Sequence, residues 1–205
     1  MHLYVQDVIT DVNSSESMKR LAACLLGYYE YAYQFFTGRV GVEGPRANPW
    51  IDQFTVTDDM KATYGAKKQV TDAPGVIGTS LNVLFESNNA LRLAFKLDEG
   101  YGPDDYTFQY FDGETWHTVE PVSIGNNRWA ILVEDIAAPN LGYMFKFVLT
   151  HKASGSTYEV SASVYSYCLL AAQNGSENMQ GLAKALYCYG EAAYEYFVKP
   201  GENGN

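Results

Sequence analysis

The stretch LLGYYEYAYQFF, Leu25–Phe36, returns later in the chain as LYCYGEAAYEYF, Leu186–Phe197. The similarity extends over residues 2–37 and 163–198, which align without a gap and are identical at 13 of 36 positions. Polar residues between the apolar segments recur together with the apolar ones. Repetition in register over this length indicates a duplicated structural unit.

Each copy is patterned as a short helix, a polar turn and a longer helix, which together predict an αα-hairpin. Asn13 and Ser15 are candidate N-caps of the first longer helix, as are Asn174 and Ser176 of the second, and Gly38 is expected to end the first. In the first longer helix, apolar residues recur every three or four positions and predict one buried face. These residues are Leu21, Leu25, Tyr28, Ala32 and Phe36.

Between the two copies the hydrophobic period changes from about 3.6 to 2, which indicates β-strands. Turn signals such as AspGly at 112–113 separate the segments. Because no helical pattern lies between them, an antiparallel β-sandwich is expected. The predicted strands are 54–57, 80–86, 90–97, 106–111, 116–122, 128–133, 143–149 and 157–161.

The predicted fold class is therefore α+β, with an antiparallel β-sandwich of about eight strands flanked by two repeated αα-hairpins. A strand precedes the second copy, so we expect a further β-domain before the first copy in the parent protein, in a hairpin, sandwich, hairpin series. The expected organisation is a hairpin at 1–38, a connector at 39–53, the sandwich at 54–161, a second hairpin at 162–198 and a linker tail at 199–205.

The charge balance is acidic, with 14 Lys and Arg against 24 Asp and Glu and a formal net charge of -10. The basic residues are scattered, so nucleic acid is not expected as a partner. The same charge disfavours an anionic membrane surface, and no apolar run approaches the ~18 residues that a membrane-spanning helix needs. We therefore expect no membrane insertion.

Three cysteines, Cys24, Cys168 and Cys188, fall in segments with a helical pattern and form no CxxC pair. This pattern favours small buried side chains. A bridge between Cys168 and Cys188 across the second hairpin is the alternative that the sequence leaves open.

No catalytic motif is present, and the histidines at 2, 117 and 151 lie far apart in the chain. Glycoside hydrolysis needs only two carboxylates and is not excluded by motif, but a sandwich of this size leaves little depth for a walled cleft. We expect a protein that is not an enzyme, and assign no catalytic residue, cofactor or metal ligand. The acidic loop Asp98–Asp105 is compatible with Ca²⁺, but it lacks EF-hand spacing and a solvated turn is favoured.

The segment Tyr106–Val119 is predicted to form a β-hairpin around residues 112–113. With a two-residue turn, Gln109 lies opposite Trp116, and the more apolar face of the hairpin turns inward. Phe111 and Trp116 then lie on the outer face. A four-residue loop keeps this arrangement, whereas a three-residue loop inverts it.

An exposed Trp beside an exposed Phe on a polar strand face is what binding of a sugar by stacking requires. The aromatic faces hold the C–H side of a pyranose ring, while amides or guanidinium groups bond its hydroxyls. The alternative is that a helical hairpin covers this face. The candidate sugar-binding residues are Trp116, Phe111, Gln109, Arg92, Tyr29, Tyr31, Trp50 and Tyr101.

The internal copy divides the aromatic residues of the first long helix into two groups. Tyr29 and Tyr31 align with Gly190 and Ala192, so the shared scaffold does not require them, and they are candidates for a ligand or lobe interface. Those that recur as the identical residue in the second copy are predicted to pack within the hairpin, namely Tyr28, Tyr33 and Phe36, and Phe35 recurs as another aromatic residue, Tyr196.

The other two tryptophans are interpreted differently. Trp129 alternates with Ile131 and Val133 in an apolar strand, so it is expected in the core. Trp50 lies in the connector and is expected to lie between the two lobes.

Four segments carry a resemblance to a known family: NGSENMQGLAKALYCYGEAAYEYF (174–197), TYEVSASVYSYC (157–168), SLNVLFESNNALRLAFKL (80–97) and YTFQYFDGETWHTVEPV (106–122). The chain resembles a module that recurs in large secreted, non-catalytic surface proteins of gut Gram-positive bacteria. Such proteins often carry dockerins, and some belong to starch-adherence assemblies. The resemblance implies a module secreted to the cell surface, with an α-glucan polysaccharide, other modules of the parent chain and a cohesin–dockerin complex as partners.

Two functions follow from these patterns. The first is a carbohydrate-binding module, with starch or another α-glucan as the ligand. The alternative is a structural or protein-interaction module, an adhesin or spacer without a sugar site. The 17 tyrosines favour the first function, because they exceed what a core of this size requires.

Overall fold

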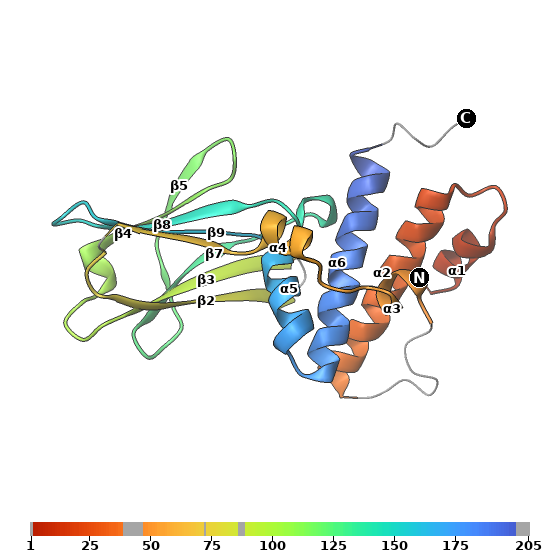
Figure 1. Ribbon diagram of the computed structural model, residues 1–205, viewed down its shortest axis with the longest axis horizontal. Helices are drawn as coiled ribbons and strands as arrows, with labels where there is room; N and C mark the ends of the chain where they lie inside the picture. Colours follow the sequence, from red (N-terminus) through yellow and green to blue (C-terminus); the bar gives the residue numbers. More distant parts are fainter. Residues whose placement is uncertain (1, 39–46, 72, 86–88, 200–205) are drawn as a thin grey trace. The chain divides into compact units, whose positions relative to one another are not determined.

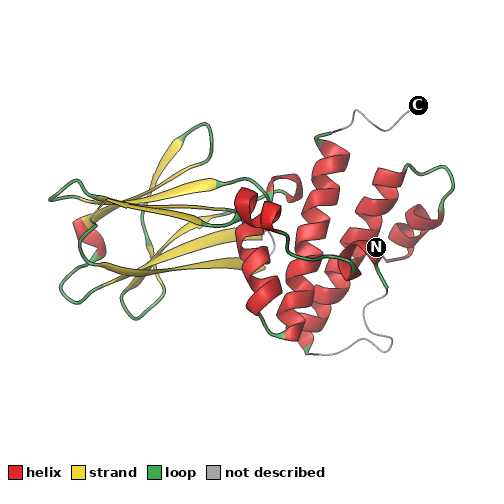
Figure 2. Cartoon of the chain, in the orientation of Figure 1, coloured by secondary structure: helices red, strands yellow, loops and turns green. Residues whose placement is uncertain are grey.

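The computed structural model describes residues 2–38, 47–71, 73–85 and 89–199 (Figure 1). In this part of the chain it is an α+β protein with two antiparallel sheets of five and four strands (Figure 2), and neither closes into a barrel. The fold class is confirmed to that extent. The chain divides into a helical unit, with residues 1–63, 138–142 and 168–205, and a sheet unit, with residues 64–137 and 143–167.

The repeat is visible in how the two long helices begin. Helix α2, Glu16–Thr37, and helix α6, Glu177–Phe197, start 161 residues apart. Ser15 and Ser176 precede them with nearly the same backbone angles, φ -63° and ψ 156° against φ -62° and ψ 161°. Ser15 Oγ accepts a hydrogen bond from Met18 N at 3.2 Å, so this predicted N-cap is confirmed. Ser176 stands at the N-cap position of α6 but makes no side-chain capping bond.

The remaining helices are short. The predicted short helices of the two copies are present as α1, His2–Thr10, and α5, Val164–Asn174. Two helices that the sequence patterns did not indicate, α3 and α4, cover Pro49–Asp52 and Asp58–Tyr64. Gly38 ends α2 with a left-handed backbone (φ 63°) and its N–H donates to Gln34 O, as predicted. Most of the predicted linker tail, and the connector from residue 39 to residue 46, lie outside the described residues.

Helices α2 and α6 pack side by side and antiparallel (Figure 1). At one end Arg20 pairs with Glu195, and at the other Gln34 Nε2 donates to Asn178 Oδ1 at 3.0 Å. Between these contacts Tyr28 stacks on Tyr189, with ring centroids 5.6 Å apart and planes within 6°. Tyr28 and Tyr189 are equivalent positions of the repeat, so the two copies meet through the same residue.

The predicted apolar face of α2 is wrong. The predicted residues are only partly buried, and Phe36 is 58% exposed. The buried face of α2 consists mostly of small residues instead. At Gly27, which has no side chain, Ile51 and Asn48 lie close to the helix backbone. Its buried residues are Ser17, Ala22, Ala23, Cys24, Leu26 and Gly27.

The sheet unit contains nine strands in the described residues. The five-stranded sheet, sheet A, has the order β1-β9-β8-β4-β5, and the four-stranded sheet, sheet B, has the order β2-β3-β7-β6. The strands are β1 Lys67–Thr71, β2 Val76–Phe85, β3 Asn89–Leu97, β4 Tyr106–Phe111, β5 Trp116–Val119, β6 Val122–Ser123, β7 Arg128–Val133, β8 Phe145–His151 and β9 Thr157–Ala162.

Three strand predictions were wrong or missing. Residues 54–57 form no strand, because the buried ring of Phe54 packs on Tyr187 of α6, with centroids 5.0 Å apart. The predicted strand 116–122 divides into β5 and β6, which belong to different sheets; Pro121 between them has no N–H to continue a ladder. Strand β1 was missed because every one of its residues is exposed, so it has no hydrophobic alternation.

Aromatic rings from the two sheets contact each other. Phe95 on β3 lies 6.2 Å from Phe108 on β4 and 5.9 Å from Tyr158 on β9, both in edge-to-face geometry. All three side chains are buried. Such pairs are a favoured arrangement of rings in a protein interior.

Candidate functional site

Strands β4 and β5 form the predicted hairpin with a different loop. Phe111 pairs with Trp116 and Gln109 with Thr118, so the loop has four residues, 112–115, and the predicted pairing of Gln109 with Trp116 is wrong. The four-residue loop is favoured because the carboxylate of Asp112 accepts hydrogen bonds from the N–H groups of Glu114 and Thr115, at 2.9 and 2.7 Å. A loop of this length keeps the predicted parity, in which Phe111 and Trp116 lie on the same, outer face of the hairpin.

Trp116 is exposed, as that parity requires. Its side chain is 49% exposed, and its ring lies against that of Phe111 with centroids 5.2 Å apart and an interplanar angle of 36°. Phe111 itself is half-buried. The two rings therefore form a tilted aromatic pair at the edge of sheet A, of which Trp116 offers the larger free surface.

Polar side chains continue this aromatic pair across the sheet. Directly opposed residues of antiparallel strands project to the same side. Gln109 Nε2 donates to Thr118 Oγ1 at 3.0 Å, and Lys146, opposite Phe111, forms an ion pair with Glu159 at 2.8 Å. We call this surface the polar platform; it consists of Trp116, Phe111, Gln109, Thr118, Lys146 and Glu159.

His117 holds the hairpin from its other side. Its Nε2 lies 2.6 Å from Asp112 Oδ2, and its ring stacks on Tyr110 with centroids 4.6 Å apart. The hydrogen bond to His117, followed by those from the Thr115 and Glu114 amides, lowers the pKa of Asp112 to about 2. Asp112 is thus a charged anchor for the loop that carries Trp116.

Two predicted sugar-binding residues lie apart from the polar platform. Arg92 is on β3 of sheet B, opposite Asn82 and Leu132, and so belongs to the other sheet. Tyr101 is half-buried, and its ring packs on Tyr106 and His151 at centroid distances of 6.3 and 6.0 Å. The structure therefore does not bring these two residues together with Trp116.

The acidic loop that carries Tyr101 is a compact turn. Residues Pro103–Asp105 form a short 3-10 helix, and Asp105 Oδ2 accepts from Gly102 N at 2.8 Å. In the described residues no group of three Asp, Glu, His or Cys side chains is placed to hold a metal ion.

On α2 the predicted division of the aromatic residues holds for Tyr28, which packs on Tyr189, but not for three others. Tyr31 was a ligand candidate, but it packs on α6, where a Cβ added at Gly181 would lie 2.5 Å from its ring. Tyr33 and Phe36 were predicted to pack in the hairpin, but they are 44% and 58% exposed. Tyr29 is exposed as expected. Repetition of a ring thus did not by itself indicate burial, because Tyr28 packs on its counterpart whereas Tyr33 and Phe36 are exposed.

The same exposed aromatic residues occur at the end of each long helix. Tyr194 and Phe197 on α6, the repeat equivalents of Tyr33 and Phe36, are 41% and 62% exposed. At each end the second ring is in edge-to-face contact with a neighbour, Phe36 with Phe35 and Phe197 with Tyr196. The duplicated unit has therefore kept two surface clusters.

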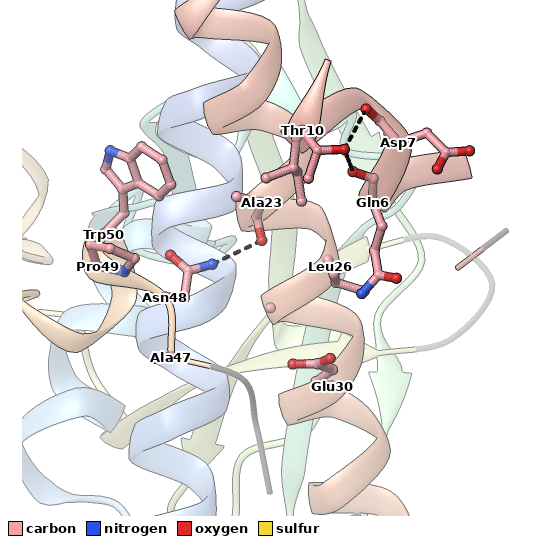
Figure 3. Close-up of a pocket in the computed structure, with 12 residues that line it drawn as sticks. Gln6, Asp7, Thr10, Ala23, Leu26, Glu30, Ala47, Asn48, Pro49 and Trp50 are labelled. Carbon is pink, nitrogen blue, oxygen red and sulfur yellow. Dashed lines mark hydrogen bonds between the residues drawn. The ribbon is translucent and has the colours of Figure 1, made fainter. Parts of the chain in front are cut away.

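Trp50 lies in α3 and lines a pocket of the helical unit that sequence reasoning did not foresee (Figure 3). The pocket has a volume of about 560 Å³. Ala23, Leu26 and Gly27 of α2 contribute to its lining. The buried Asn48 fixes one wall by donating to Ala23 O at 2.9 Å, as Figure 3 shows. Nothing in the hydrophobic pattern marks Asn48 as buried.

The comparisons with known proteins add no relative. The scan against protein-family models finds no match. Searches of curated proteins and of solved structures find none either. The functional argument therefore rests on the geometry of the site.

All three cysteines are free and buried in the structure, which forms no bridge between Cys168 and Cys188. Burial raises the pKa of Cys24 to about 11 and that of Cys188 to about 12. Cys188 Sγ donates to Trp50 O at 3.3 Å. Low thiolate content makes these side chains poor nucleophiles, and they act as packing residues.

Among the described residues, no helix combines the length and the apolar character that a membrane span needs.

Proposed function

We propose that this protein is a non-catalytic carbohydrate-binding module, with starch or another α-glucan as the ligand, and that sheets A and B form a β-sandwich that carries the site. The observation that supports it is the exposed Trp116 beside Phe111, continued by polar side chains on one face of sheet A. The resemblance adds the rest of the proposal, a module of a protein secreted to the cell surface.

The polar platform offers the two kinds of contact that a sugar uses. The face of Trp116 stacks on the C–H side of a pyranose ring, and this contact buries apolar area on both partners. Gln109 and Thr118 are already joined to each other, so their remaining donor and acceptor positions are fixed in direction before the ligand arrives. Preorganisation of this kind reduces the entropy lost on binding.

The composition of the polar platform favours binding without catalysis. Glycoside hydrolysis uses two carboxyl groups on either side of the scissile bond. The platform holds one carboxylate, Glu159, and this is ion-paired with Lys146. The proposed site therefore binds the polysaccharide and leaves it intact.

Native affinity electrophoresis in gels with amylopectin tests the proposal. We expect the wild-type protein to be retarded and Trp116→Ala to lose retardation, because removal of a central aromatic anchor weakens binding by about 10- to 100-fold. Phe197→Ala, which removes another exposed ring, from α6, is the matched control and should migrate as the wild type does.

Two results would contradict this proposal. Unretarded migration of the wild type in amylopectin and in gels with other glucans would remove the glycan function. Loss of retardation in Trp50→Ala with retention in Trp116→Ala would move the site to the pocket of the helical unit.

The alternative function, a protein-interaction or spacer module, is favoured by a separate observation. Tyr33 and Phe36 on α2 and their equivalents Tyr194 and Phe197 on α6 are exposed in both copies. Exposed aromatic clusters are frequent at protein interfaces. Under this alternative no glucan retards the protein, and replacement of Trp116 has no effect on migration.

A further inference from the structure

A cavity opens in the sheet unit where β5 ends. After Val119 the chain leaves sheet A, passes Glu120 and Pro121, and enters sheet B as β6. The cavity at this point has a volume of about 330 Å³, within the range of small-molecule sites. Among the residues that line it are Trp129, Asp104, Glu120, Thr107, Thr118 and Lys152.

Trp129 is the aromatic wall of this cavity. It was predicted to be in the core, but it is half-buried and lines the cavity. Its Nε1–H donates to Asn127 Oδ1 at 3.1 Å, and Asn127 Nδ2 in turn donates to the carbonyl oxygens of Leu97, Asp98 and Tyr101. The indole is therefore held in one orientation by a side chain that is itself fixed at three points.

The other lining groups are rich in hydrogen-bond acceptors. Asp104 and Glu120, both exposed, bear carboxylates, and Thr107 and Thr118 bear hydroxyls. The ammonium group of Lys152 donates to Asp104 O at 2.8 Å, which ties it to one side of the cavity. Two carboxylates in a chain of net charge -10 disfavour an anionic ligand and suit neutral hydroxyl groups.

The cavity adjoins the polar platform through a shared residue. Thr118 lines the cavity and also accepts the hydrogen bond from Gln109. Trp116 and Glu120 are four residues apart, and four residues of an extended chain span about 13 Å. A disaccharide stacked on Trp116 is therefore too short to reach Glu120, and a ligand that contacts both contains several sugar units.

We propose that this cavity is a second subsite, which takes the end or a branch of a neutral oligosaccharide whose other part stacks on Trp116. This inference rests on the proposed function and deepens it. The platform then provides the general affinity for the polysaccharide, and the cavity provides the preference for chain length and charge.

Isothermal titration calorimetry with maltose and maltoheptaose tests this subsite. Glu120→Gln keeps the shape of the side chain and removes the charge, so we expect maltoheptaose to bind about 3- to 10-fold more weakly. The affinity for maltose, which is too short to span both places, should stay unchanged. Glu134→Gln, an exposed glutamate just after β7, is the matched control and should bind both sugars as the wild type does.

The outcomes separate the subsite from the proposed function. If Trp116→Ala abolishes binding and Glu120→Gln changes neither sugar, the subsite is overturned and the proposed function stands. An equal loss for maltose and maltoheptaose in Glu120→Gln also overturns it, because a distant subsite cannot weaken a disaccharide. A wild-type protein that binds neither sugar overturns the α-glucan assignment and the subsite with it.

Discussion

Asp112 links the local chemistry of the β4–β5 hairpin to the exposure of Trp116. Its carboxylate bonds the amides of Glu114 and Thr115 and lies against His117. These bonds select a four-residue loop, and that loop length sets which face of the strand carries Trp116. One acidic side chain therefore decides whether the polar platform contains an aromatic anchor.

The lowered pKa of Asp112 predicts a dependence of stability on pH. Its folded pKa, about 2, is below its ordinary value of 3.8, so the stabilisation is complete above 3.8 and is lost as the pH falls through 3.8 towards 2. We expect Asp112→Asn to melt at a lower temperature than the wild type near neutral pH, and the difference to shrink towards zero near pH 2. Thermal melts followed by circular dichroism measure it.

Glu114→Gln is the control for this measurement, because Glu114 is exposed in the same loop. It should melt as the wild type does at every pH. A melting difference between wild type and Asp112→Asn that stays constant down to pH 2 would show that the charge of Asp112 does not stabilise the loop.

The candidate site was predictable where it depends on strand parity and not where it depends on tertiary contacts. The alternation of apolar and polar residues on either side of AspGly at 112–113 was enough to place Trp116 on the outer face of the hairpin. Tyr31 and Tyr33 could not be sorted in this way, because the position that accepts the Tyr31 ring is Gly181, 150 residues further along the chain. Trp129 was misplaced because its strand is apolar while its end of the sheet unit is open.

Helix α2 packs through small residues, and Gly27 is the point of closest approach. A Cβ added at Gly27 would lie 2.4 Å from Ile51 Cδ1 and 3.0 Å from Asn48 Nδ2. Ile51 is buried, and Asn48 holds the bond to Ala23 O. A larger side chain must displace both.

We therefore predict that Gly27→Val destabilises the protein by about 1–3 kcal/mol, as overpacking of a close contact does. Urea denaturation followed by circular dichroism measures this. Tyr29→Val, at an exposed position of the same helix, introduces the same β-branched residue without crowding and serves as the control. Equal stability of the two variants would show that the contact at Gly27 can relax freely.

Helices and strands were predictable where their sequences alternate clearly between apolar and polar residues or belong to the repeat. Helices α2 and α6 followed from the repeat, and strands such as β3 from alternation. Strand β1, Lys67–Thr71, has no buried residue and is defined only by its pairing with β9, which is remote in sequence. Phe54 reads as part of a strand, yet its partner is Tyr187 on a helix. Strand propensity is a property of the local sequence, so it carries no information about contacts with residues far along the chain.

The duplicated unit also places two equivalent residues against each other. Equivalent residues Tyr28 and Tyr189 stack on each other, so this pair of repeat positions lies where the long helices of the two copies meet. The sequence alignment identifies equivalent residues but does not say that they touch. The pairing of α2 with α6 required the structure.

The overall charge of the chain leads to the last prediction. The net charge is -10, so an anionic glycan is repelled, whereas a neutral α-glucan has no charge for salt to screen. We expect the dissociation constant for maltoheptaose to change by less than about twofold between about 0.1 and 1 M NaCl, as the Debye length falls from about 10 to about 3 Å. Calorimetry at these two salt concentrations measures it, with Lys146→Met, which removes the cation of the polar platform, as a comparison. Affinity that falls steeply with salt in the wild type but not in Lys146→Met would show that the ligand is held by its own negative charge, and a neutral glucan would then be the wrong ligand class.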